Sequence, residues 1–299
     1  MTVAKRIEIG AQTERGTVLP GVLFREGKRT RTAVIAITGI HGNFWSNPFY
    51  YDFGDALARA GHDFVYAETC DAQGQLEVPN ANTGGTDAIG SFCEDFAWID
   101  EDVDAYVRWA RREGYEGVVL CGHSLGANKV VHYLSGHHDS FVEHFVLLSP
   151  ANMDFLLGQV TEDQRKVVDR ACRSGQSDRL LPFAVFGWAP MLAGTARQWL
   201  HANPLDNVHT DPARDFSQAR AVTQAGALLI GTRDAFALGD PEALVRVTSA
   251  AFPKAGDNQI ILIEGTGHTY QRRVPETTQA LVGLVRGWDA QHAGHTEGL

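Results

Sequence analysis

Three residue types in this chain are spaced in a way that could support nucleophilic catalysis. A serine, Ser124, lies in the stretch 122–126, GHSLG, directly after the apolar run 117–121. A serine hydroxyl is a weak nucleophile at neutral pH and needs a base within hydrogen-bond reach. His268 follows the last apolar run of the chain and Asp234 follows the one before it. The three side chains could therefore carry out acyl transfer, with His268 as the base and Asp234 as the group that orients it.

The residues around Ser124 predict a sharp turn between a strand and a helix. The run 117–121 is short and rich in β-branched residues, which is typical of a strand buried on both faces. After Gly126 the apolar residues recur with a helical period. The five-residue pattern alone would occur by chance in about one such chain in ten. Its position between a strand and a helix favours a nucleophile elbow, in which flanking glycines let the two elements approach closely.

Two other aspartates could act as the acid in place of Asp234. Asp234 comes at the end of a predicted strand, a few residues after Gly231. Asp240 is a first reserve, although it precedes Pro241 and is therefore typical of a helix cap. Asp154, which follows the sixth predicted strand, is a second reserve. We expect Asp234 to be the acid, because it alone has both the position and no competing local role.

Strands and helices alternate along most of the chain. Apolar or alternating runs predict eight strands, at 6–9, 17–24, 32–38, 64–67, 117–121, 144–148, 227–230 and 259–263. Helical patterns lie between them, at 48–60, 95–112, after 126, from 241 and at 275–288. We expect 68–92 to be a long loop, either functional or a plain surface excursion, and the tail 290–299 to be frayed. This alternation indicates an α/β fold with a mostly parallel sheet.

The segment 151–222 interrupts this alternation. It contains no strand pattern, and its helical fragments are broken by glycines and prolines. Large apolar residues are concentrated there, including Phe183 and Trp188. We predict a helical insertion that lies above Ser124 and roofs a substrate pocket, the alternative being an insertion that only packs on the body of the protein.

Composition excludes several other classes of protein. The 299 residues are 44% hydrophobic and 21% charged, a globular balance. A net charge of −10 argues against partners such as nucleic acid or an anionic membrane surface. No apolar stretch reaches the length of a membrane span or a signal peptide, and the four cysteines are expected to be free thiols, with a Cys70–Cys93 bridge as the alternative. We therefore expect a cytoplasmic protein.

Cofactors and metals are not expected either. The chain has neither a G-x-G-x-x-G dinucleotide fingerprint nor a Walker loop. Its histidines outside the catalytic group do not show the spacing of metal ligands. The predicted chemistry therefore depends on the amino-acid side chains alone.

These features together resemble the α/β-hydrolase superfamily over nearly the whole chain. The resemblance rests on the elbow after the fifth predicted strand and on the chain order Ser124, Asp234, His268. It implies an eight-stranded core made of 1–150 and 223–299, with a helical cap at 151–222 inserted after strand 6. The region 180–182 also shows a slight resemblance to a fungal hydrolase family that includes siderophore esterases.

The resemblance also implies two donors for an oxyanion. One is the backbone N–H of Leu125, the residue after the nucleophile. The second is expected from His41-Gly42-Asn43, which resembles the family's HG-x motif, with the amide of Asn43 as first choice and that of Phe44 next. We expect His41, Phe44, Phe183 and Trp188 to contact the substrate.

The function expected from the sequence is a serine hydrolase that cleaves a carboxylic ester or lactone through an acyl-enzyme, without a cofactor. Its partner is expected to be a small molecule with a hydrophobic or aromatic part. An amide, peptide or C–C bond hydrolase or an acyltransferase could use the same triad, and a non-catalytic binding protein could use the same fold. Haloalkane or epoxide chemistry is disfavoured, because it would require an aspartate in place of Ser124.

Overall fold

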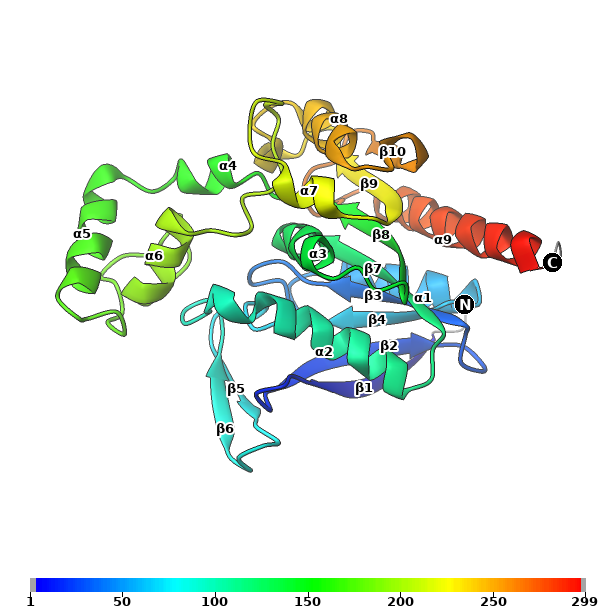
Figure 1. The fold of residues 1–299 in the computed structure, drawn as a ribbon, viewed down its shortest axis with the longest axis horizontal. Coiled ribbons are helices and arrows are strands. Elements are labelled where there is room, and N and C mark those ends of the chain that lie inside the picture. Colours follow the sequence, from blue (N-terminus) through cyan, green and yellow to red (C-terminus); the bar gives the residue numbers. More distant parts are fainter. Residues whose placement is uncertain (1–3, 297–299) are drawn as a thin grey trace.

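Eight strands form one sheet in the computed structural model, which describes residues 4–296 (Figure 1). β2 runs antiparallel to both β1 and β4, and the remaining neighbours pair in parallel. The mostly parallel sheet predicted from the sequence is therefore confirmed. Across the sheet the order is β1 (Lys5–Gln12), β2 (Val18–Arg25), β4 (Asp63–Ala67), β3 (Thr32–Ile37), β7 (Gly117–His123), β8 (Val142–Leu148), β9 (Ala225–Gly231) and β10 (Gln259–Ile263).

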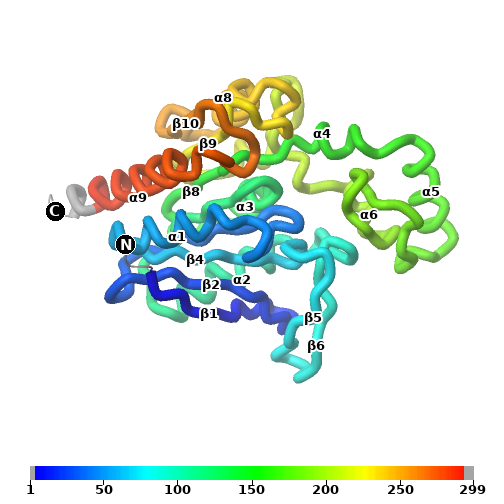
Figure 2. Tube along the Cα trace, turned by 180° about the vertical axis from the view of Figure 1, so that it is seen from behind, coloured from blue at the N-terminus to red at the C-terminus, as the bar shows by residue number. Residues whose placement is uncertain are grey.

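Helices cover both faces of this sheet, which explains why the central strands are apolar throughout. Every residue of β3 and of β7 is buried. α1 (Phe49–Arg59) and α9 (Val274–Thr296) pack on one face, and α2 (Ile99–Arg112), α3 (Leu125–Gly136), α7 (Ser217–Ala221) and α8 (Pro241–Ala251) supply the apolar cluster on the other (Figures 1 and 2).

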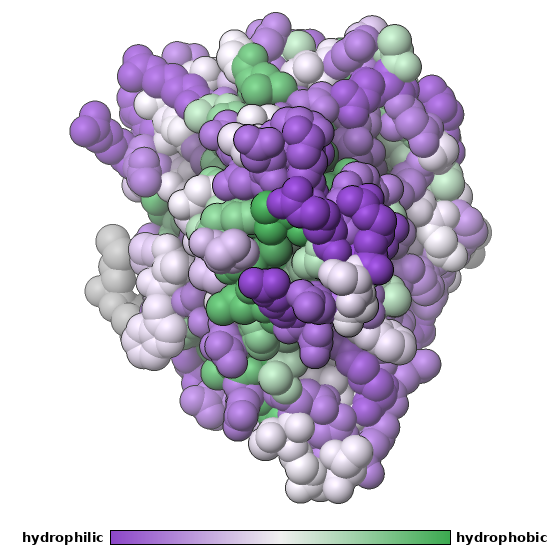
Figure 3. All heavy atoms as spheres, turned by 90° about the vertical axis from the view of Figure 1, so that its left-hand side faces the viewer, coloured by the Kyte–Doolittle hydropathy of each residue, from purple (hydrophilic) through white to green (hydrophobic). Residues whose placement is uncertain are grey.

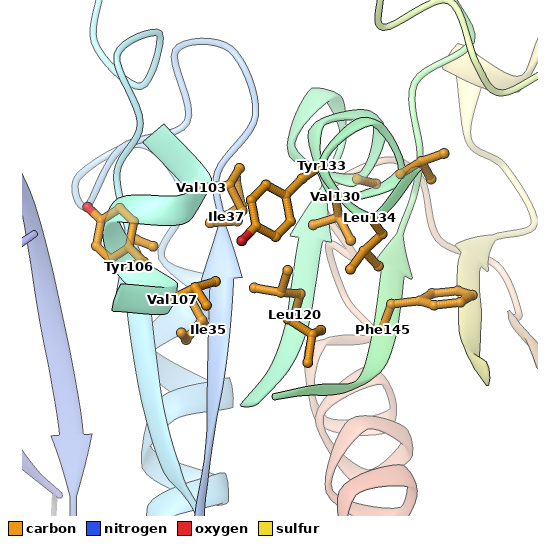
Figure 4. Close-up of a cluster of buried hydrophobic side chains, with 14 of the residues drawn as sticks. Ile35, Ile37, Val103, Tyr106, Val107, Leu120, Val130, Tyr133, Leu134 and Phe145 are labelled. Atoms are coloured by element: carbon orange, nitrogen blue, oxygen red, sulfur yellow. The ribbon is translucent and has the colours of Figure 1, made fainter. Parts of the chain in front are cut away.

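The second of these layers shows how the helical patterns are used. In Figure 4, Val103 and Tyr106 of α2 and Val130 and Leu134 of α3 meet side chains of the central strands, among them Leu120. Spacings of three and four residues place these side chains on one face of each helix. The nucleophile helix α3 is thereby held against the middle of the sheet.

The predicted loop 68–92 is wrong in part, because it contains a two-stranded hairpin. β5 (Leu76–Pro79) pairs antiparallel with β6 (Thr86–Ile89) outside the main sheet. These strands are four residues long and mostly exposed, so they give almost no apolar signal. The hairpin is attached to the body by Val78 and Ile89, which are buried in the core cluster, and by a hydrogen bond from Thr17 Oγ1 to Asp87 (2.7 Å).

Two helix boundaries also differ from the prediction. The expected helix 95–112 begins as a short 3-10 turn, η1 (Phe96–Trp98), capped by the Asp95 side chain, and continues as α2. The last helix, α9, extends to Thr296, so the prediction of a frayed tail is wrong up to that residue. Residues 297–299 of the predicted tail lie outside the described part of the chain. None of the described helices is long and apolar enough to span a membrane.

The segment between β8 and β9 is helical, as predicted. It contains α4 (Met153–Leu157), α5 (Glu162–Arg173), α6 (Ala193–His201) and α7, with a capping box of Thr161 and Gln164 at the start of α5. α5 and α6 lie beyond the ends of the strands in both views (Figures 1 and 2). They contribute to a second apolar cluster, which includes Met191 and Trp199 and also Ile99 of α2 and Leu125 of α3. Phe216 and Val222 belong instead to the core cluster of the sheet.

Candidate active site

Ser124 occupies a strained turn between β7 and α3. Its φ of 55° and ψ of −126° lie in a region that residues with a side chain rarely adopt. The backbone is held there because the amide of Ser124 donates to the carbonyl of Leu148, 3.0 Å away. A Cβ on Gly122 would lie 2.2 Å from the carbonyl oxygen of Gly126, which explains the glycine at that position. The strand, turn and helix predicted around the serine are thus present.

Asp234 and His268 are hydrogen-bonded. His268 Nδ1 lies 2.9 Å from Asp234 Oδ2 and 3.1 Å from Oδ1. The carboxylate is buried and also accepts from the amide of Phe236 at 2.9 Å, while the Phe236 ring stacks on the imidazole with centroids 4.0 Å apart. A carboxylate beside Nδ1 keeps the proton on that nitrogen and leaves Nε2 able to accept one. The ring is therefore oriented as a general base requires.

The two reserve acids have other partners. Asp240 caps α8 by accepting from the amide of Ala243 at 2.9 Å. Asp154 forms an ion pair with Arg214, with 2.7 Å between Oδ2 and Nη1. Of the three candidate acids, the structure brings only Asp234 to His268.

Ser124 and His268 face a common cavity of about 240 Å³. No hydrogen bond joins the two side chains among the described residues, and such contacts often tighten only when substrate binds. The lining contains no Asp, Glu, Lys or Arg. The residues around the cavity are Gly39, Ile40, His41, Gly42, Ser46, Asn47, His123, Ser124, Leu156, Trp188, Phe236, His268 and Thr269.

His123, the residue before the serine, supports the loop that carries His268. Its Nε2 lies 2.8 Å from the backbone carbonyl of His268. Burial lowers the pKa of His123 to about 3, so the ring is neutral and donates from Nε2 to that carbonyl. The elbow strand and the histidine loop are thus tied together directly.

Two of the four predicted substrate contacts line the cavity. His41 and Trp188 are both there, with ring centroids 5.1 Å apart, and burial lowers the pKa of His41. Phe44 does not line this cavity but packs in an aromatic cluster with Tyr51 and Tyr66, so its role as a substrate contact stays a prediction. Phe183 does not line the cavity either and packs against the apolar cluster that includes Met191, so its role also stays a prediction.

The loop after β3 approaches the serine at Gly39 and not at the predicted Asn43. Asn43 does not line the cavity, and its amide donates to Ser46 Oγ at 3.0 Å. Gly39 lies against the elbow instead, since a Cβ there would be 2.8 Å from Ser124 Cβ and 3.2 Å from the Leu125 amide nitrogen. The structure therefore does not support Asn43 as the oxyanion donor, nor Phe44, whose amide donates to Glu68 Oε1 at 2.7 Å.

The amides of Ile40 and Leu125 are the candidate donors for an oxyanion. Ile40 lines the cavity, and its N–H has no hydrogen-bond partner within residues 4–296. Leu125 is the first residue of α3, so its N–H has no acceptor within the helix. Sequence reasoning placed this donor at Asn43, because His41-Gly42-Asn43 resembles the HG-x motif, and did not consider the segment Thr38-Gly39-Ile40, which follows β3 directly. It also missed Leu156 and Phe236, although Phe236 is only two residues from Asp234.

Metal-binding arrangements are not found in the described part of the chain, where no three His, Cys, Asp or Glu residues are placed to hold an ion. The four cysteines are free thiols, so the alternative of a Cys70–Cys93 bridge is not realised.

A comparison with known families identifies the family of this chain. A model of the alpha/beta hydrolase family matches residues 40–284, and the chain therefore belongs to that family. A sequence search of curated proteins found no match.

Solved structures with the same fold are distant in sequence. Est1E from Butyrivibrio proteoclasticus superposes with a TM-score of 0.64 at 14% identity, over 95% of this chain and 99% of that one. An esterase from Pyrococcus furiosus gives 0.60 at 15% identity, over 95% and 91% of the two chains. A monoacylglycerol lipase from Paleococcus ferrophilus gives 0.61 at 16% identity, over 89% and 97%. At these identities the likeness is one of fold.

Proposed function

We propose that the protein is a serine hydrolase that cleaves a carboxylic ester or lactone through an acyl-enzyme. The observation that carries this proposal is the Asp234–His268 pair, which faces the same cavity as the strained Ser124. A strained serine beside an oriented imidazole is the arrangement that nucleophilic catalysis requires.

The reaction proceeds in two halves. Ser124 Oγ attacks the acyl carbon while its proton passes to His268 Nε2, and Asp234 stabilises the imidazolium that forms. The amides of Ile40 and Leu125 donate to the developing oxyanion, each contributing roughly 3 kcal/mol of transition-state stabilisation. His268 then protonates the leaving alcohol. Water, activated by the same ring, attacks the acyl-enzyme and releases the acid.

The lining of the cavity indicates the kind of substrate. Ile40, Leu156, Trp188 and Phe236 provide apolar walls, and no charged Asp, Glu, Lys or Arg side chain contributes to it. We propose that segment 151–222 acts as a cap, because it supplies Leu156 and Trp188. Figure 3 shows the side of the molecule that carries α5 and α6, with a band of hydrophobic side chains between hydrophilic ones. A short, uncharged acyl or aryl group suits these walls.

A fluorophosphonate probe tests the nucleophile directly. We expect it to modify the protein once, at Ser124, because a phosphonyl group reacts with an activated serine as an ester does. The measurement is intact-protein mass followed by peptide mapping. Denatured protein is the control, since the serine is activated only in the folded site. Modification of another residue, or equal labelling after denaturation, would contradict the proposal.

Trp188→Ala is expected to change the preference for acyl length. Trp188 forms a wall of the cavity and is 43% exposed, so its removal opens space without emptying the core. We expect the ratio of kcat/KM for octanoyl and acetyl p-nitrophenyl esters to rise about tenfold. Each methylene group of the acyl chain that fits into an apolar pocket contributes about 1–3 kcal/mol to transition-state binding. Trp45→Ala is the matched control, because Trp45 is 86% exposed and outside the cavity. An unchanged ratio in Trp188→Ala would remove Trp188 from the acyl site.

Amide hydrolysis, C–C bond hydrolysis and acyl transfer remain alternatives on the same residues. A screen of ester, lactone and amide substrates with and without an acceptor alcohol separates them. A non-catalytic binding protein would label weakly or not at all with the probe and would turn over none of these substrates.

A further inference from the structure

His41 lines the catalytic cavity, but the hydrolysis proposed above gives its side chain no role. The residue is half-buried, and its Nε2 is hydrogen-bonded with the hydroxyl of Ser91, in the segment that follows β6. Ser91 is 0% exposed and does not line the cavity. The imidazole therefore connects a buried serine outside the cavity with the cavity itself.

The backbone of His41 is fixed in a conformation that residues with a side chain rarely adopt. Its φ is 58°. Its amide donates to the carbonyl of Asp71 at 2.8 Å, and its carbonyl accepts from Ser46 Oγ at 3.0 Å. The Asp71 side chain is itself fully buried and paired with Lys129 at 2.6 Å. The imidazole is thus attached to a well-anchored part of the loop after β3.

The imidazole of His41 is neutral at neutral pH. Burial lowers its pKa, and the attraction of the Asp71 carboxylate offsets this effect only in part. A neutral imidazole carries one proton, and the hydrogen bond made at one nitrogen decides which nitrogen holds it. The tautomer of His41 therefore depends on what Ser91 does at Nε2.

The Ser91 hydroxyl decides this tautomer because its hydrogen has one acceptor. Its only hydrogen-bond partner within residues 4–296 is His41 Nε2. A proton on Nε2 would leave the buried hydroxyl hydrogen without an acceptor, which is unfavourable. When the hydroxyl donates to Nε2, both groups are satisfied and the imidazole proton is on Nδ1.

Nδ1 of His41 is available to a bound molecule. It has no hydrogen-bond partner in the described part of the chain, and it is accessible, unlike Nδ1 of His123, which is buried without a partner. Nε2 lies on the side of Ser91 and Gly74, neither of which lines the cavity. Because the ring does line the cavity, Nδ1 is the nitrogen on the cavity side.

The surroundings of this N–H donor are uncharged. The Trp188 ring meets the His41 ring edge to face, with centroids 5.1 Å apart and an interplanar angle of 73°. The lining contains no Asp, Glu, Lys or Arg, so nothing there would balance the charge of an anion. A neutral N–H beside an apolar wall is matched by an uncharged acceptor oxygen, and a ligand without one would leave the donor unpaired.

We infer that His41 donates from Nδ1 to a second oxygen in the acyl group of the substrate, and that Ser91 holds the ring in this donor form. The inference rests on the proposed hydrolysis, in which the amides of Ile40 and Leu125 bind the ester carbonyl oxygen and leave Nδ1–H for a different acceptor. The acyl group is the partner because Trp188, beside the ring, belongs to its proposed wall. The substrate class is thus an ester or lactone whose acyl group carries a keto or ether oxygen. Ser91 touches no reacting atom and is a positioning residue.

The tautomer can be measured without turnover. Long-range ¹H–¹⁵N correlation spectra of the full-length protein, labelled with ¹⁵N-histidine, distinguish a proton on Nδ1 from one on Nε2. We expect the His41 signals, assigned by their loss in His41→Phe, to show the proton on Nδ1. Ser91→Ala is expected to populate the Nε2–H form, because it removes the hydroxyl that donates to Nε2. Ser249→Ala, at another buried serine in α8 outside the cavity, should leave the tautomer unchanged.

Pairs of similar p-nitrophenyl esters test the acceptor. Methoxyacetate and butanoate differ by an ether oxygen in place of a methylene, and 4-oxopentanoate and 4-methylpentanoate by a keto oxygen in place of a methyl group. For at least one pair, we expect His41→Phe to lower the ratio of kcat/KM for the oxygen-bearing ester to that for its partner about three- to tenfold, the range for one neutral hydrogen bond. Comparing this ratio between variants cancels the intrinsic reactivity of the esters. A purely structural role would slow both members of a pair equally.

Ser91→Ala should lower the same ratio in the same direction. The double variant, His41→Phe with Ser91→Ala, should lose no more than His41→Phe alone, because Ser91 acts only through the imidazole. Ser249→Ala is again the matched control and should keep the wild-type ratio. Circular dichroism and the thermal unfolding midpoint of each variant verify that the folds are intact.

Three results would overturn the inference. They are a His41 proton on Nε2 in the wild type, an unchanged ratio in His41→Phe for both pairs, and additive losses in the double variant, which would remove Ser91 from the positioning role. Failure of the proposed hydrolysis has a different signature. In that case none of the four esters is turned over and the fluorophosphonate does not label, whatever the tautomer of His41, and the assignment of a substrate class fails with it.

Discussion

Ser124→Ala is expected to lower kcat for a short p-nitrophenyl ester by about 10⁶-fold, because removing a catalytic serine leaves only the oxyanion donors and binding. Hydrogen in place of the hydroxyl removes the attacking oxygen and adds no bulk. The substitution also keeps a Cβ, which the φ of 55° already accommodates, so the fold should be preserved. Steady-state kinetics measure the loss, and fluorophosphonate labelling of the variant should disappear with it.

A serine on the helix that follows Ser124 provides the control for this substitution. Ser135 lies near the end of α3, where its hydroxyl donates to the carbonyl of His132 at 2.7 Å, and it does not line the cavity. Ser135→Ala should therefore retain wild-type turnover. If Ser124→Ala kept activity within tenfold of the wild type after purification from contaminating esterases, a nucleophile other than Ser124 would have to be sought.

Asp234→Asn is expected to lower kcat by about 10⁴-fold. An amide can still accept from the Phe236 amide, so the loop should keep its shape. However, the Asn side chain can donate to Nδ1, which would favour the proton on Nε2 and prevent that nitrogen from accepting the proton of Ser124. It would also leave the imidazolium without its counter-charge. The measurement is kcat for the same ester over a range of pH.

Two other aspartates separate this effect from a general loss of carboxylate charge. Asp240→Asn should act as an N-cap almost as well as aspartate, and Asp154→Asn loses only an ion pair to Arg214 at the surface. Both variants are expected to stay within about twofold of wild-type turnover. A 10⁴-fold loss in either of them, together with normal activity in Asp234→Asn, would reassign the acid.

Much of the fold could be predicted because its central strands are buried on both faces. Runs such as those of β3 and β7 are apolar without interruption, and α2 and α3 repeat apolar residues at helical spacing. These patterns depend on local chemistry and need no knowledge of the partner element. The hairpin β5–β6 was missed because its strands are only four residues long and place just Val78 and Ile89 in the core cluster, which is too short an apolar pattern to predict a strand.

The sequence predicts those parts of the candidate site at which a close backbone approach requires a particular residue type. Gly122 and Gly126 are needed because side chains there would collide with the facing backbone, and this requirement produces the motif around Ser124. No comparable sequence motif identifies the second oxyanion donor. Two glycines, Gly39 and Gly42, both follow β3, and only the packing of Gly39 against the Ser124 Cβ distinguishes them.

The sequence alone determined the alternation of strands and helices and the chain order of Ser124, Asp234 and His268, because those features follow from residue types and their local spacing. The tertiary structure decided which aspartate meets His268, which amides face the serine, and which aromatic side chains reach the cavity. Phe44 and Trp188 are equally apolar in the sequence, yet one packs into the core and the other lines the site. The position of each side chain depends on how segments distant along the chain pack together. Local residue spacing does not determine that packing.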